Sequence, residues 1–114
     1  MSVTQHLCYD SLNSLKEVME DDFNFLIETF IHDSQDRLAK FYELVGGDDF
    51  DAIRRASHSV KGSCSNLGAL RLASLYAALE RKALDKDIPN LGTDLAEIEA
   101  EFLTVKQMML DFIA

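Results

Sequence analysis

Apolar residues recur along the chain at the three-and-four spacing of amphipathic helices, and no stretch keeps the alternation of a strand. This pattern predicts a short helix over residues 10–19 and four long helices. The long helices are expected over about 21–45, 48–67, 69–84 and, from a start between 89 and 93, to about 112. Long amphipathic helices joined by short loops predict an all-α fold. We expect an antiparallel up-down-up-down four-helix bundle with an additional short N-terminal helix.

The chain length and the loop residues complete this outline. We expect residues 1–114 to form one domain, because 114 residues is a typical domain size. Residues 1–7 are expected to be a flexible tail. The Gly46-Gly47 pair and Gly68 are expected to end their helices in the left-handed conformation, and Asp48 is expected to cap the next helix.

The predicted helix 48–67 turns one of the three histidines away from its apolar stripe. The stripe consists of Phe50, Ile53, Ser57, Val60, Cys64 and Leu67. An α-helix turns about 100° per residue, so His58 lies roughly 130° from the centre of this stripe. We therefore expect His58 to face solvent. Arg54 lies one turn before it, and Lys61 and Gly62 lie one turn after it.

These neighbours suit an imidazole that carries phosphate. An unperturbed imidazole titrates near pH 6.5, so a neutral, nucleophilic form is available at about pH 7. A phosphoryl group adds nearly two negative charges, which Lys61 could hold as a mobile point charge. Gly62 leaves space for a partner, although glycine costs about 1 kcal/mol relative to alanine inside a helix. Arg54, Arg55 and Lys61 form a small basic islet that suits a partner with an acidic pocket.

The segment from residue 58 to residue 69 resembles the signature of histidine-containing phosphotransfer (HPt) domains, roughly H-x-x-K-G-x-[SA]-x-x-x-G-A. The matching residues are His58, Lys61, Gly62, Gly68 and Ala69. Two positions depart from the family pattern. Cys64 stands where the family usually has Ser or Ala, and Ser57 stands where Ala is common. Both residues are small, so neither departure removes the chemistry. The resemblance extends over most of the chain.

This resemblance implies a stand-alone bacterial HPt protein, a monomer that acts as a phosphocarrier and not as an ATP-dependent kinase. His58 would accept a phosphoryl group on Nε2 from the receiver-domain aspartate of a hybrid sensor histidine kinase. It would then pass the group to the aspartate of a response regulator. No cofactor is expected on this chain, since the partner receiver domain brings Mg²⁺.

The resemblance also suggests roles for the residues around the histidine. Lys61 would stabilise the phosphoryl group, and Gly62 would give the partner access. Arg54, Ser65 and Glu80 are further candidates for contacts around the group. For Glu80, an ordinary charge at the rim of the core is an equally good interpretation.

Charge and cysteine content exclude several other classes of protein. A net charge of −9 argues against nucleic acids and anionic membranes as partners. The sequence shows no signal peptide and no apolar run of the length that spans a membrane, so we expect a cytoplasmic protein. Its two cysteines, Cys8 and Cys64, suggest neither a disulfide framework nor a metal site.

Three alternatives remain for the bundle. Di-metal bundles use Glu-x-x-His pairs, but Glu28 and His32 are four residues apart, so we assign no metal ligand. His6 and His32 are expected to be solvated. A histidine kinase dimerisation domain usually has an acidic residue directly after its histidine, where this chain has Ser59. A purely structural or interaction bundle would need no phosphotransfer at all.

Overall fold

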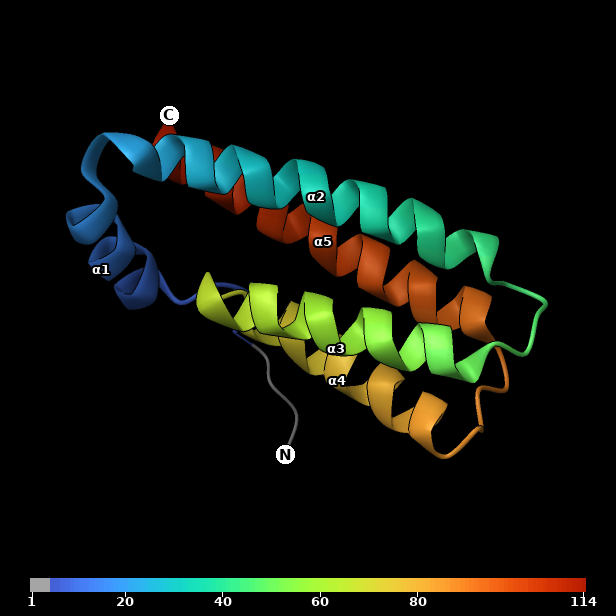
Figure 1. Ribbon diagram of the computed structural model, residues 1–114. Coiled ribbons are helices and arrows are strands. Elements are labelled where there is room, and N and C mark those ends of the chain that lie inside the picture. The colour runs from blue at the N-terminus through green and yellow to red at the C-terminus, as the bar shows by residue number, and fades with distance from the viewer. Residues whose placement is uncertain (1–4) are drawn as a thin grey trace.

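The computed structural model describes residues 5–114 as six helical segments without a strand. They are α1 (Tyr9–Met19), the 3-10 segment η1 (Glu20–Asp22), α2 (Phe23–Glu43), α3 (Phe50–Asn66), α4 (Leu70–Leu84) and α5 (Leu91–Ile113). The four long helices lie side by side, and each runs opposite to the one before it, while α1 lies at one end of the bundle (Figure 1). The predicted all-α four-helix bundle with a short N-terminal helix is confirmed. Within residues 5–114, no helix has the length and apolar character needed to cross a membrane.

The core is built from the apolar stripes of the helices. On α5 six apolar residues at helical spacing are buried, namely Leu91, Leu95, Ile98, Phe102, Val105 and Met109. On α3 the stripe from Ile53 to Leu67 is buried, while Phe50 at its start is half-buried. The helix predicted to run to about residue 45 ends earlier: α2 stops at Glu43, and Val45 is exposed in the following turn.

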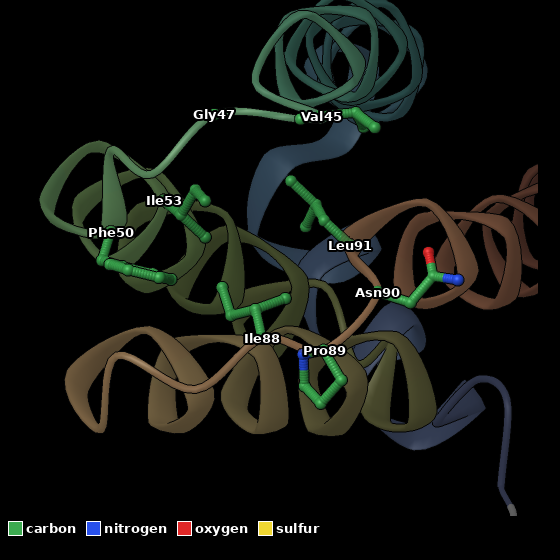
Figure 2. Close-up of a pocket in the computed structure, with 9 residues that line it drawn as sticks. Val45, Gly47, Phe50, Ile53, Ile88, Pro89, Asn90 and Leu91 are labelled. Carbon is green, nitrogen blue, oxygen red and sulfur yellow. The ribbon is translucent and has the colours of Figure 1, made fainter.

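The helix ends follow simple local rules. Gly46 (φ 89°) and Gly68 (φ 74°) take the left-handed conformation beyond α2 and α3, as predicted. The cap of α3 is Asp49 and not Asp48, since the Asp49 carboxylate accepts a hydrogen bond from the backbone N–H of Ala52 at 3.1 Å. The turn after α2 and the loop before α5 border a pocket of about 370 Å³ at the end of the bundle opposite α1 (Figures 1 and 2).

The expected flexible tail over residues 1–7 is wrong for residues 5–7, and residues 1–4 lie outside the described part of the chain. Leu7 is only 2% exposed. The carbonyl of Gln5 accepts a hydrogen bond from the backbone N–H of Arg71 (3.1 Å), and the backbone N–H of Cys8 donates to the carbonyl of Gly68 (2.8 Å). These bonds hold the N-terminal segment, residues 5–8, against the start of α4.

A buried carboxylate holds the same segment from the other side. This carboxylate belongs to Glu101 on α5, which is only 5% exposed. Nδ1 of His6 lies 2.8 and 2.9 Å from its two oxygens, and Nε of Arg71 lies 3.3 Å from one of them. The prediction that His6 is a solvated tail residue is therefore wrong. Burial of the Glu101 carboxylate is tolerated because two basic side chains meet it.

Candidate functional site

His58 lies in the middle of α3 with its side chain 68% exposed. Its neighbours in sequence, Ser57 and Val60, are buried in the core on the opposite side of the helix. The exposure follows from the helical pattern, as predicted. An exposed imidazole can be reached by a partner protein without any opening of the bundle.

The carboxylate of Glu80 on α4 contacts both His58 and Lys61. Its Oε2 lies 2.9 Å from Nδ1 of His58, and its Oε1 accepts a hydrogen bond from Nζ of Lys61 at 2.6 Å. Glu80 is only 14% exposed, because the carboxylate lies between the two helices. Glu80 is therefore part of the site and more than a rim charge. The resemblance suggested that the Lys61 ammonium stabilises a phosphoryl group. In this structure the ammonium is paired with the carboxylate of Glu80.

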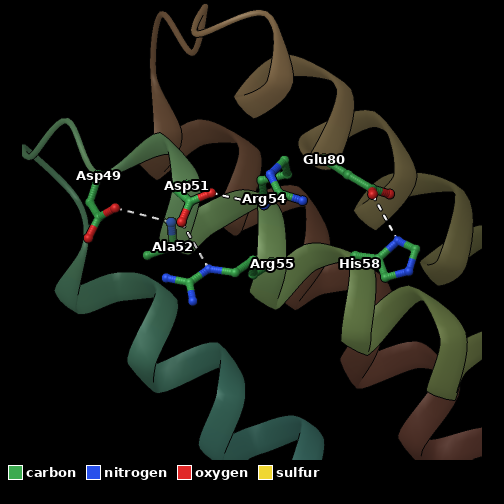
Figure 3. Close-up of polar contacts among 7 residues, drawn as sticks. All are labelled: Asp49, Asp51, Ala52, Arg54, Arg55, His58 and Glu80. Carbon is green, nitrogen blue, oxygen red and sulfur yellow. Dashed lines mark hydrogen bonds and ion pairs between the residues drawn. The ribbon is translucent and has the colours of Figure 1, made fainter.

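The contact between Glu80 and His58 decides which ring nitrogen of the neutral imidazole carries the hydrogen. The hydrogen bond from Lys61 is the main cause that lowers the pKa of Glu80, and the bond to His58 acts in the same direction while burial opposes it. An ionised carboxylate can only accept hydrogen bonds, so Nδ1 of His58 carries the hydrogen. The lone pair of the neutral ring is then on Nε2, which faces away from Glu80 (Figure 3).

Gly62 provides an open surface next to His58. The glycine is exposed one turn further along α3, and a Cβ built there would meet nothing within 4 Å. Its lack of a side chain is therefore not required by packing inside this protein.

The two arginines of the basic islet share one carboxylate partner on α3. Asp51 pairs with Arg54 at 2.9 Å and with Arg55 at 3.0 Å (Figure 3). The hydrogen bond from Arg54 is the main cause that lowers the pKa of Asp51. Asp51 and Glu80 thus pair with all three cations of the islet, and the Arg55 side chain stays 67% exposed.

Two other residues complete the surroundings. Ser65 is exposed two turns beyond His58, and no hydrogen bond in the described part of the chain joins its side chain to the imidazole. Sequence reasoning missed Arg37 on α2, whose guanidinium donates to Oγ of Ser59 at 2.7 Å and pairs with Asp33 at 3.0 Å. Arg37 is 22 residues from Ser59, so no local pattern could indicate this contact.

The structure offers no support for a metal centre in residues 5–114, where no three His, Cys, Asp or Glu side chains gather to hold a metal ion. His32 is exposed, as expected, and its Nδ1 lies 3.5 Å from the Asp36 carboxylate on the next turn of α2. Glu28 borders the same shallow surface but makes no cluster with them.

Three comparisons relate this chain to known proteins. Residues 26–109 match the family model of the Hpt domain. The chain is 25% identical over 84 residues to the phosphorelay protein LuxU of Vibrio harveyi, which covers 74% of each protein. Its fold resembles the crystal structure of histidine-containing phosphotransfer protein B from Pseudomonas aeruginosa PAO1, with a TM-score of 0.90 and 34% identity. That match covers 96% of this chain and 95% of the other.

Proposed function

The chain belongs to the Hpt domain family, and from this premise we propose that it carries a phosphoryl group on Nε2 of His58 in a two-component phosphorelay. One observation supports the assignment to Nε2 above all others. Nδ1 of this exposed ring donates to an ionised carboxylate, which leaves the lone pair of the neutral imidazole on the nitrogen that faces away.

The transfer follows from that arrangement. The Nε2 lone pair attacks the phosphorus of an aspartyl phosphate on a receiver domain. The bond between phosphorus and the aspartate oxygen breaks, and its electron pair stays on the aspartate. His58 is then a phosphoimidazolium with its hydrogen still on Nδ1. The reverse reaction with the aspartate of a second receiver domain releases the group.

The partners we propose are the receiver domain of a hybrid sensor histidine kinase and that of a response regulator. A relative with 25% identity is named a phosphorelay protein, which supports this class of partner. Gly62 leaves the surface beside His58 open, so a receiver domain could approach closely. We propose that the receiver supplies Mg²⁺ and that this chain contributes no cofactor, since phosphoryl transfer depends mainly on positioning and charge neutralisation.

The test is incubation of the protein with a receiver domain that carries radiolabelled phosphate. We expect label on the wild type that is stable to base and labile to acid, as phosphohistidine is. His58→Gln should take up no label, while its unfolding in urea should match that of the wild type, because an exposed side chain is changed.

The matched control is His32→Gln, which removes an exposed imidazole from α2 and should leave labelling intact. Incubation with ATP alone should leave the protein unlabelled. Equal labelling of His58→Gln and the wild type would overturn the assignment.

A further inference from the structure

A groove between α2 and α5 lies away from His58 and brings exposed apolar side chains together with acidic ones. We propose that this groove binds an amphipathic helix of a partner protein, one that carries lysine or arginine on both sides of its apolar stripe. A helix bound there would leave His58 free to meet a receiver domain.

Both helices contribute apolar surface to the groove, which has a volume of about 270 Å³. Its lining includes Leu38, Ala39 and Tyr42 of α2 and Glu99, Phe102 and Leu103 of α5. Leu38 and Phe102 are buried, whereas Tyr42 is 38% exposed and Leu103 is 54% exposed. Apolar surface therefore extends from the core to the solvent at this place.

The apolar surface continues along α5. Leu110 is 37% exposed and follows Leu103 by two turns, so it lies on the same side of the helix about 10 Å further along. Ala96 is also exposed and precedes Leu103 by two turns. Apolar residues that recur after two turns form the stripe that one helix presents to another. The groove and its continuation therefore fit a helical partner.

The charged residues of the bundle are divided between its two layers. The pair α2 and α5 lies opposite the pair α3 and α4 (Figure 1). The segments α2 and α5 contain nine acidic and three basic residues, which gives a net charge of −6. The segments α3 and α4 contain two acidic and six basic residues, which gives a net charge of +4 with His58 neutral. The groove is thus on the acidic side of the molecule, opposite the layer that carries His58.

Acidic side chains reach the groove itself. Glu99 lines it, and burial and then this nearby carboxylate raise the pKa of the Tyr42 hydroxyl. Glu28 is exposed about four turns before Tyr42 and so lies on the same side of α2. Lys106 is the single basic residue of α5. A partner therefore meets apolar surface bordered by negative charge.

This charge selects the occupant of the groove. A second copy of the chain would bring the same net charge of −6, and like charges that face each other across an interface oppose binding. Anionic membrane surfaces are repelled for the same reason. A helix with basic residues beside its apolar stripe can cover Leu103 and Leu110 and also pair with the carboxylates around them.

The probe is a fluorescent synthetic peptide of about 18 residues, with leucine at helical spacing and lysine at the remaining positions. We expect the full chain to bind this peptide with micromolar affinity, and to bind it more weakly as the salt concentration rises. The same peptide with glutamate in place of lysine should not bind. Backbone amide NMR signals should shift on α2 and α5 and stay unchanged around His58.

Two leucines of nearly equal exposure provide a matched pair of variants. Leu103→Gln changes the groove and should weaken peptide binding about tenfold, the effect expected for one leucine that becomes buried on binding. Leu84→Gln changes a leucine that is 56% exposed at the end of α4, and it should bind the peptide as the wild type does. Both side chains are exposed, so both variants should unfold in urea as the wild type does.

The groove assignment has several ways to fail. Equal peptide binding by Leu103→Gln and the wild type would overturn it, as would NMR shifts confined to α3 and α4 or equal binding of the glutamate peptide. Self-association of the wild type that Leu103→Gln abolishes would make a second copy the occupant and would refute the charge argument. Labelling of His58 by a phosphorylated receiver should continue with the peptide bound. Absence of that labelling without any peptide would contradict only the proposed function.

Discussion

The substitution Gly62→Ala should make this protein more stable and a poorer phosphorelay partner. Gly62 lies inside α3, where no packing contact requires a glycine, since an added Cβ meets nothing within 4 Å. Alanine is favoured over glycine in a helix interior by about 1 kcal/mol. For a domain of this size, that gain raises the melting temperature by about 4 °C.

The matched control is Gly68→Ala, at the other end of the same motif. Gly68 has a φ of 74°, which costs a residue with a side chain about 1–2 kcal/mol. Its Cβ would also lie 3.1 Å from the Cβ atoms of Cys8 and Ser11, closer than ordinary contact. Both changes replace glycine by alanine. We nevertheless expect Gly62→Ala to raise the free energy of unfolding and Gly68→Ala to lower it.

The assay is equilibrium unfolding in urea, in which a change of midpoint at constant slope reports stability. The functional measurement is the rate of labelling by a phosphorylated receiver domain. Gly62→Ala should slow it modestly and Gly62→Leu strongly, because each fills the open surface beside His58. A fall in stability for Gly62→Ala would refute the helix argument. A wild-type labelling rate for Gly62→Leu would refute the argument about access.

Three further predictions concern groups inside the bundle. Ser57→Ala should raise stability by about 1 kcal/mol in urea, because the buried Oγ of Ser57 has no hydrogen-bond partner in residues 5–114. Glu101→Ala should lower stability by about 1–3 kcal/mol in the same assay, since it removes the buried acceptor that meets His6 and Arg71. Burial raises the pKa of the Cys64 thiol to about 12, so a thiol reagent at about pH 8 should modify Cys8 in the folded protein and both cysteines only in urea. For the same reason, stability should fall as the pH rises above 9.0, where the thiol ionises first in the unfolded chain.

The helices and the exposure of His58 could be predicted from the sequence because both depend on a local rule. The rotation of about 100° per residue places each side chain relative to the stripe of its own helix. A second local rule, the ease with which glycine takes the left-handed conformation, explains why Gly46 and Gly68 could be assigned to helix ends. Local rules of this kind do not predict which side chains of a neighbouring helix a residue will contact.

The contacts that define the site lie between helices and could not be predicted in this way. Glu80 could be assigned to the edge of its helix, but its contact with His58 depends on how α3 and α4 pack. The burial of Glu101 could not be predicted, because acidic residues on a helix are usually solvated. Its partner His6 is 95 residues away and lies in a segment with no helical pattern.

The attachment of residues 5–8 to α4 and α5 makes this segment a reporter on the bundle end. A protease must seat several residues of extended, unbonded chain, and here the carbonyl of Gln5, the N–H of Cys8 and the side chain of Leu7 are all engaged. Cleavage at these positions therefore requires the segment to detach first. The rate of nicking there, compared across variants, measures how often this end of the molecule opens under native conditions.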